Sequence, residues 1–242
     1  MELPLIEKAK LFQGIQVFRS KLLKLSLVVG LVAIASSFFL DVIIPLLEKP
    51  LGFPLVLYAP GEALVTIIKI CIFTSLFLTF PFLLYELWTA LAPIFITIST
   101  MQTCIIVLSS WLLFLSGVLL CYMAVLPFAI QFLIGFGGEH LEPLLSANRY
   151  LTFVMTLIFA FGVIFELPLI LLLLARIGIV TAPFLSKYRR YAILVIAIAS
   201  AVITPTPDAY TMLLMAAPLY LLYEVSIILI KLFGKHDRVT SN

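Results

Sequence analysis

Glu166 is the residue in this 242-residue sequence whose type and position most strongly suggest chemistry. It lies in the otherwise apolar segment FGVIFELPLILLLL, about 22 Å along a helix from Leu151 at 1.5 Å per residue. A carboxyl group at that depth costs roughly 2.5–3.5 kcal/mol on membrane-insertion scales and usually faces a protein interior or a wet cavity. Pro168 has no backbone N–H and deprives the Ile164 carbonyl of its helical partner. We therefore predict a kinked polar site within a membrane span that contacts a substrate or a partner; the alternative is a buried structural carboxyl.

Other acidic residues near apolar runs have simpler interpretations. Glu86 and Glu224 each lie within about two helical turns of a predicted membrane interface, where charged side chains can reach water. Glu62 follows the turn Pro60-Gly61 and complements the dipole at the start of the next helix. The alternative for Glu62 is a surface that contacts cargo.

The sequence offers no arrangement of residues for catalysis. Neither His140 nor His236 lies in an apolar run, so no serine in a span has a base beside it. The pair Ser116-Gly117 is interpreted as small residues for helix packing. HExxH motifs, paired intramembrane aspartates, nucleotide-binding loops and Cys/His clusters are all absent from the sequence. We predict a protein that is not an enzyme and that binds no metal or cofactor.

The elements that must position Glu166 are membrane helices, because the composition excludes a soluble domain. Hydrophobic residues make up 64% of the chain and charged residues 11%, against roughly 45–50% and 25% in soluble domains. The 52 residues between Glu86 and Glu139 contain no Asp, Glu, Lys or Arg. That stretch is too long for one span, and Pro93 with the polar run that follows marks a break.

The apolar runs predict a single all-α membrane domain over 1–242. The first run carries no short signal-peptide core and is expected to remain as a span. Six transmembrane helices are expected at about 24–44, 63–88, 104–127, 150–175, 190–203 and 210–230. Only 13 residues separate Arg190 from Thr204, so we expect the last two spans to be short for a hydrocarbon core of about 30 Å.

The basic residues place both ends of the chain in the cytoplasm. An even number of spans puts the two ends on one side, and twelve of the fifteen Lys and Arg residues fall on that side. These are Lys8, Lys10, Arg19, Lys21, Lys24, Arg176, Lys187, Arg189, Arg190, Lys231, Lys235 and Arg238. Lys and Arg accumulate in cytoplasmic loops, and aromatic residues such as Tyr188 and Tyr191 gather at the interfaces.

Several motifs resemble those of the TatC family, the multispanning core of the twin-arginine protein translocase. The similar segments are LLYELWTALAP at 83–93, FAFGVIFELPLIL at 159–171, AVITPTPDAYTMLLMAAPLYLLYE at 201–224 and YAPGE at 58–62. The matching positions are Pro50, Glu62, Pro93, Glu166, Pro168, Thr204, Pro207 and Asp208. The similarity extends from about residue 14 to 233.

The resemblance implies a concave, glove-shaped bundle with Glu166 on its inner face, in the inner or plasma membrane of a cell or in a thylakoid membrane. It implies a receptor for the twin-arginine signal peptides of folded cargo, driven by the proton-motive force. The implied partners are TatA-like and TatB-like single-span proteins, further copies of the chain and membrane lipid, with no nucleic acid.

The sequence departs from the family at two acidic positions. In the N-terminal pattern Arg19 is retained, but Val17 stands where the family has an acid, and Ser99 replaces a glutamate in the first cytoplasmic loop. Those acids usually pair with the two arginines through charge-assisted hydrogen bonds. We therefore expect weakened twin-arginine recognition, unless Glu7 or Glu86 replaces them. Two other interpretations are a proton-coupled secondary transporter that uses Glu166 and a TatC-derived scaffold that does not transport.

Overall fold

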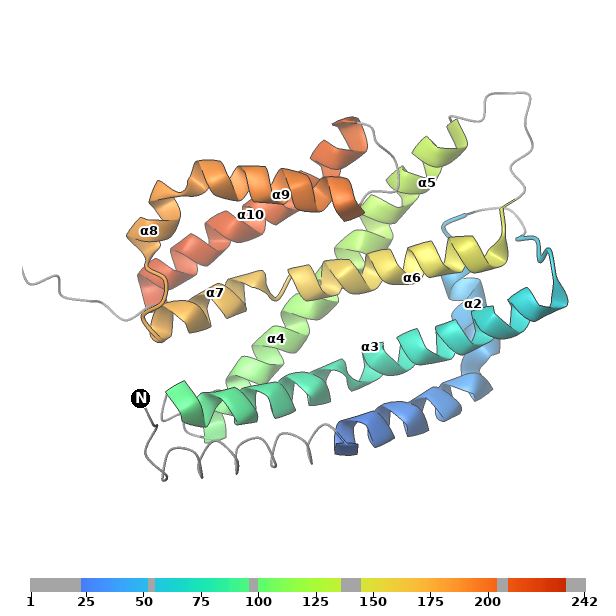
Figure 1. Cartoon of the computed structure of the whole chain (residues 1–242), viewed down its shortest axis with the longest axis horizontal. Helices are drawn as coiled ribbons and strands as arrows, with labels where there is room; N and C mark the ends of the chain where they lie inside the picture. Colours follow the sequence, from blue (N-terminus) through green and yellow to red (C-terminus); the bar gives the residue numbers. More distant parts are fainter. Residues whose placement is uncertain (1–22, 52–54, 96–99, 136–144, 204–208, 234–242) are drawn as a thin grey trace, which may run out of the picture. The chain divides into compact units, whose positions relative to one another are not determined.

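The computed structural model describes residues 23–51, 55–95, 100–135, 145–203 and 209–233, and their regular structure is helical (Figure 1). The prediction of an all-α fold is confirmed for these residues. After a helical stretch over 23–36, the elements are a 3-10 turn Ser37–Phe39, α2 Leu40–Glu48, α3 Pro60–Phe95, α4 Thr100–Leu120, a π-helical turn Cys121–Val125, α5 Leu126–Gly135, α6 Ala147–Ile164, α7 Leu167–Arg176, α8 Ala182–Lys187, α9 Arg189–Ile203 and α10 Ala209–Phe233.

The chain divides into two compact units. The first consists of Met1–Leu46 and Tyr58–Leu108, and the second consists of Leu47–Leu57 and Ser109–Asn242. In the first unit, a hydrogen bond inside the apolar layer joins α3 to the stretch over 23–36. The hydroxyl of the buried Ser75 donates to the carbonyl of Val29 at 2.7 Å. A polar side chain in a membrane helix needs such a partner, because lipid offers none.

In the second unit, α4 and α6 approach each other closely at two glycines. A Cβ atom on Gly162 would lie 2.4 Å from the ring of Phe114, and one on Gly117 would lie 2.7 Å from the backbone oxygen of Phe161. Both contacts are shorter than side-chain carbons permit, so only glycine fits there. Small residues at helix crossings in membranes allow this close packing. The packing role predicted for Gly117 is therefore confirmed.

Pro127 accounts for the π-helical turn between α4 and α5. Its nitrogen cannot donate to the carbonyl of Met123, and its ring would collide with that carbonyl in a regular α-helix. The helix widens over Cys121–Val125 and then continues as α5.

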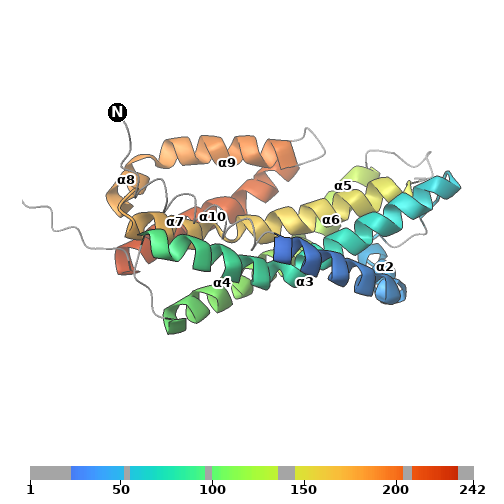
Figure 2. The same ribbon diagram turned by 60° about the horizontal axis from the view of Figure 1, so that its bottom comes forward.

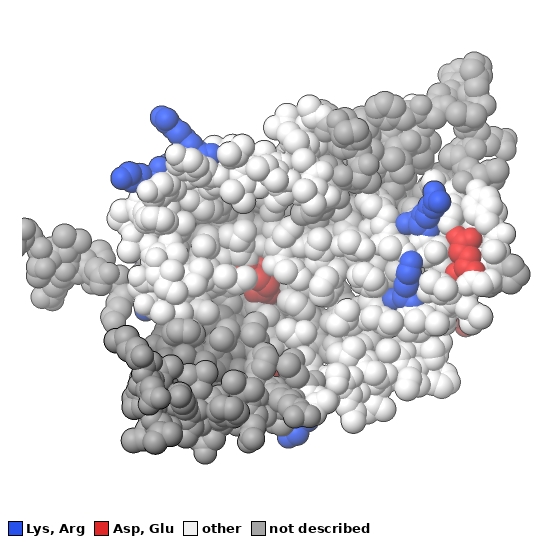
Figure 3. All heavy atoms as spheres, viewed as in Figure 1, with Lys and Arg blue, Asp and Glu red and all other residues white. Residues whose placement is uncertain are grey.

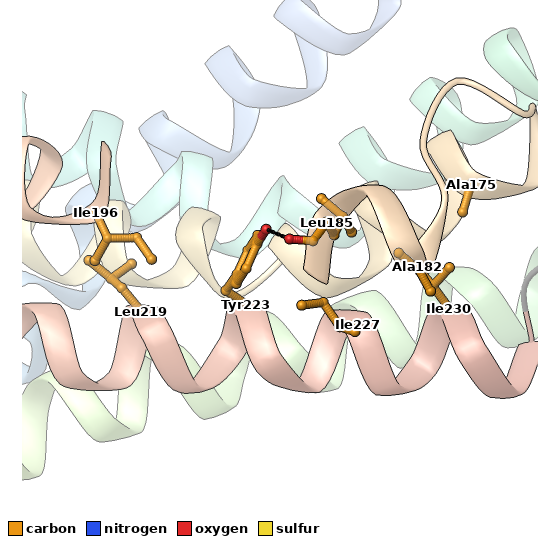
Figure 4. Close-up of a cluster of buried hydrophobic side chains, with 8 residues drawn as sticks. All are labelled: Ala175, Ala182, Leu185, Ile196, Leu219, Tyr223, Ile227 and Ile230. Carbon is orange, nitrogen blue, oxygen red and sulfur yellow. Dashed lines mark hydrogen bonds between the residues drawn. The ribbon is translucent and has the colours of Figure 1, made fainter. Parts of the chain in front are cut away.

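The last four helices of the second unit pack around one apolar cluster (Figures 1 and 2). Its buried residues are Ala175, Ala182, Leu185, Ile196, Leu219, Tyr223, Ile227 and Ile230. Figure 4 shows Tyr223 directed from α10 toward α8, where its hydroxyl donates to the carbonyl of Leu185 at 2.9 Å. This bond fixes the short helix α8 against α10.

Five helical segments in the described residues are long and apolar enough to cross a membrane. They are Leu23–Glu48, Gly61–Glu86, Thr103–Gln131, Ala147–Arg176 and Met215–Leu232. The remaining apolar helix is α9, whose 15 residues extend about 22 Å, less than the hydrocarbon core of about 30 Å. Figure 3 shows wide areas of one face without charged side chains, as lipid contact requires.

One expectation about span length needs correction. We expected the last span to be short, but α10 has 25 residues and extends about 37 Å, with Pro218 inside the helix. We expected Pro93 and the polar run that follows it to mark the break before the third span. The helix α3 continues through Pro93 and ends two residues later at Phe95, and residues 96–99 lie outside the described part of the chain.

The close contact between α4 and α6 leads to a stability prediction. Gly162→Ala forces a methyl group against the buried ring of Phe114 and should destabilise the protein by about 1–3 kcal/mol. The measurement is the unfolding temperature of the purified protein in detergent. Gly30→Ala is the matched control, because nothing lies within 4 Å of its added carbon. Equal unfolding temperatures for the two variants would contradict the packing analysis.

Candidate functional site

Glu166 lies in the interior of the second unit and is only 4% exposed. Its Oε2 atom accepts a hydrogen bond from the hydroxyl of Ser110, a residue of α4 that is completely buried. Its Oε1 atom is also buried, and no described residue provides a hydrogen-bond partner for it. A carboxyl oxygen without a donor in an apolar interior is costly.

The helix register explains how Ser110 reaches Glu166. Four residues separate Gly162 from Glu166 on one helix and Ser110 from Phe114 on the other, so each pair lies on one helix face. The ring of Phe114 lies against Gly162, and one turn further along, Ser110 meets Glu166. The glycine contact therefore sets the distance between the helices at which the serine hydroxyl and the carboxyl can bond.

Aromatic rings hold this contact in place. Phe114 stacks on Trp111 with a centroid distance of 5.8 Å and meets the edge of Phe159 at 6.1 Å. Such pairs contribute about 0.5–1.5 kcal/mol beyond the area they bury. The bond between Ser110 and Glu166 therefore lies one helical turn from a cluster of aromatic rings.

The helix breaks at Glu166, as the sequence predicts from Pro168 (Figure 1). α6 ends at Ile164, and the Glu166 N–H turns tightly to the carbonyl of Val163 at 3.1 Å. The chain resumes as α7, with the buried Pro168 at a position in the first turn where no backbone N–H is needed.

Glu224 forms a second polar contact in this unit, between α9 and α10. Its carboxylate pairs with Arg189 at 2.8 Å and accepts a hydrogen bond from Tyr220 at 3.0 Å. Arg189 lies 35 residues before Glu224 in the sequence, so the contact joins two helices. Since both side chains are partly exposed, the pair is worth about 0–1 kcal/mol.

The structure brings together two of the predicted site residues, Glu166 and Pro168, and adds Ser110. Glu62 acts within its own turn, where its Oε2 atom accepts the N–H of Tyr58 at 3.0 Å. Pro50 lies in the turn after α2, before the buried Leu51. Pro93 is part of α3. The predicted residues Arg19, Ser99, Thr204, Pro207 and Asp208 lie outside the described residues.

Sequence reasoning missed Ser110. The available signal was the pair Ser109-Ser110 in the uncharged run that forms α4. A hydroxyl in a span needs an acceptor, but it often uses a carbonyl of its own helix, as Ser116 does with Leu113 at 2.7 Å. Only the crossing of α4 with α6 shows that Ser110 uses a carboxylate instead.

These features define a class of protein: a multi-pass helical membrane protein with a buried carboxyl at a helix break. The sequence matches the family described as Sec-independent protein translocase protein (TatC) over residues 14–218. This chain belongs to the TatC family and is a subunit of a protein translocase. Six spans, with α9 as a short fifth one, are consistent with this membership.

Relatives and a solved structure agree with this assignment. The TatC protein of Carboxydothermus hydrogenoformans is 32% identical over 224 residues, which cover 91% of this chain and 92% of the relative. The TatC protein of Aquifex aeolicus is 36% identical over 202 residues, which cover 81% and 83%. A crystal structure of the twin-arginine translocase receptor TatC in the detergent DDM matches with a TM-score of 0.79 at 32% identity, covering 89% of this chain and 98% of that one.

The bond between Ser110 and Glu166 leads to a second stability prediction. Ser110→Ala removes the donor to Oε2 and leaves a buried carboxyl without a donor among the described residues, at a cost of about 1–3 kcal/mol. Ser116→Ala is the control, since that hydroxyl is exposed and bonds within its own helix. The unfolding temperature in detergent should fall for the first variant only. An equal fall in the unfolding temperature of the control would show that the bond between Ser110 and Glu166 stabilises the protein no more than a hydroxyl bonded within its own helix.

Proposed function

We propose that this chain is the core receptor subunit of a twin-arginine translocase, which binds signal peptides of folded cargo and exports that cargo with the proton-motive force. Membership of the TatC family supports this proposal, as does the likeness to a protein described as a translocase receptor. The observation that carries the site assignment is the buried Glu166, with one oxygen held by Ser110 and the other available to accept a hydrogen bond.

Glu166 acts in this proposal as an intramembrane acceptor for a polar group on an incoming helix. A donor that reaches Oε1 would offset the desolvation of the carboxyl, so docking of a helix with a polar residue at that depth is favoured over docking of an apolar one. The incoming helix belongs to a signal peptide or to a TatA-like or TatB-like single-span partner. Ser110 and the Gly162 contact keep the carboxyl directed for this purpose.

The residues that match family motifs outside the described part complete the proposed contact set. Arg19 and the position of Ser99 belong to the cytoplasmic region that meets the signal peptide, while Thr204 and Asp208 belong to the turn between the last two spans. Pro50 and Glu62 shape the turns around the spans, and Pro93 lies near the end of α3. Assembly with further copies of the chain and with lipid belongs to the same proposal.

A weaker preference for arginine is part of the proposed receptor. Val17 and Ser99 stand where the family has acids, so the charged hydrogen bonds of an arginine pair, on the order of 1.5–3 kcal/mol each, are missing at those positions. The scaffold interpretation predicts no export at all, whereas a receptor with relaxed recognition still exports. Membership of a translocase family argues against the interpretation of the chain as a proton-coupled secondary transporter.

Glu166→Ala should abolish export while the protein level stays near normal, because the substitution removes the intramembrane acceptor. Glu166→Gln should keep part of the activity, since an amide oxygen also accepts from Ser110. The measurement is export of a folded reporter carrying a twin-arginine signal, in cells that lack their own TatC. Glu224→Gln, a partly exposed carboxyl paired with Arg189, is the control and should export normally. Normal export by Glu166→Ala would remove the assigned role.

A twin-lysine signal peptide should bind about as well as a twin-arginine one, because the two family acids are replaced by Val17 and Ser99. The measurement is the dissociation constant of matched Arg-Arg and Lys-Lys peptides on the purified protein, at low and high salt. A tenfold or greater preference for Arg-Arg that disappears in Glu7→Gln or Glu86→Gln would contradict this prediction and identify the replacement acid.

A further inference from the structure

An exposed row of aromatic side chains marks the corner where α8 passes into α9. Phe184 and Tyr188 have ring centroids 4.6 Å apart, and Tyr188 and Tyr191 have centroids 5.7 Å apart. Their exposed fractions are 52%, 38% and 64%, so the rings contact one another at tilted angles on the surface instead of entering the core. Tyrosine prefers the level of the lipid headgroups, where its ring is in an apolar layer and its hydroxyl in water.

Basic side chains alternate with these rings. The ammonium group of Lys187 lies 6.0 Å from the ring centroid of Tyr188, and Arg190 is exposed two residues further on. Arg189, which lies between Lys187 and Arg190 in the sequence, forms an ion pair with Glu224 at 2.8 Å. No ion pair joins Lys187 or Arg190 to another residue in the described part of the chain. Two positive charges are therefore presented at the corner without a negative partner there.

Two further basic residues lie at the same end of this helix group. Ala175 of α7, Ala182 of α8 and Ile230 of α10 belong to one buried cluster (Figure 4), and the exposed Arg176 and Lys231 directly follow the first and last of them. Glu224 is the acidic residue of α7–α10 among the described residues, and Arg189 already neutralises it. Figure 3 shows basic side chains over the α8–α9 corner with no acidic one beside them.

We propose that the α8–α9 corner, residues 184–191, binds the phosphate headgroup of an anionic phospholipid in the cytoplasmic leaflet. The charge distribution places this corner at the cytoplasmic surface, where the leaflet carries the anionic lipids. Lys187 and Arg190 supply the charge that a phosphate diester needs. The ring row of Phe184, Tyr188 and Tyr191 lies along the glycerol and upper acyl region of the same lipid.

The corner is held in one position by the protein, as a binding site requires. The Tyr223 hydroxyl bonds the carbonyl of Leu185, and Glu224 holds Arg189, so both sides of Tyr188 are attached to α10. A lipid bound here keeps the cytoplasmic end of α9 at headgroup level. Because α9 extends only about 22 Å, which is less than the thickness of the hydrocarbon core, its opposite end then stops short of the other membrane interface.

The test is native mass spectrometry of the full chain in detergent, titrated with dioleoylphosphatidylglycerol or dioleoylphosphatidylcholine. The wild type should retain the anionic lipid preferentially. Removing a basic side chain near the surface weakens attraction to anionic lipid about fivefold, so Lys187→Gln with Arg190→Gln should weaken binding about 25-fold. Lys69→Gln with Arg149→Gln is the matched control and should stay within twofold of the wild type. Because Lys187 and Arg190 are exposed, the double variant should unfold at the wild-type temperature, which the same preparation tests.

Several results would overturn the proposal. Equal retention of the two lipids would show that charge recognition is absent, and an equal loss in the control pair would show that the corner is not the site. Displacement of the lipid by equimolar inorganic phosphate would indicate a site for a free anion. Binding of an acidic peptide that phosphatidylglycerol does not displace would indicate a protein partner instead. None of these measurements depends on export activity, so they separate this site from the proposed receptor function.

Discussion

The cost of a polar group in hydrocarbon is the constraint on which the rest of this structure depends. Backbone amides satisfy it by forming helices, and polar side chains satisfy it by meeting other side chains or carbonyls inside the protein. Glu166 is the extreme case, because its carboxyl lies deep in a span and one oxygen is held by Ser110. The break at Pro168, the close crossing at Gly162 and the ring of Phe114 all serve to place that hydroxyl and that carboxyl together.

The site therefore combines stability and function in one contact. Gly162 and Gly117 let α4 and α6 approach, and the approach allows a hydrogen bond that a larger residue would prevent. The second carboxyl oxygen stays buried without a donor among the described residues. In the receptor proposed above, a donor on an incoming helix would offset part of the cost of burying this oxygen.

The last four helices address a different requirement, the position of a helix that is too short for the bilayer. α9 cannot reach both membrane interfaces at once, because its 15 residues extend only about 22 Å. The cluster around Tyr223 and the pair of Arg189 with Glu224 attach its cytoplasmic end to α10. The exposed rings and cations at the same end favour the headgroup region, so protein contacts and lipid contacts reinforce each other at this corner.

The sequence by itself determined the membrane class, the helical fold and the shortness of α9, because hydropathy and proline act locally along the chain. The cytoplasmic position of the two ends and a role for Glu166 stay predictions from charge bias and from the cost of a buried carboxyl. The sequence placed the last span at about 210–230, but the expectation that this span is short was wrong, because α10 extends over Ala209–Phe233. It also could not pair Ser110 with Glu166, or Arg189 with Glu224, which are 56 and 35 residues apart. Those pairs depend on how helices cross, and the crossing is set by side-chain shape at Gly162 and Gly117, which only the tertiary structure displays.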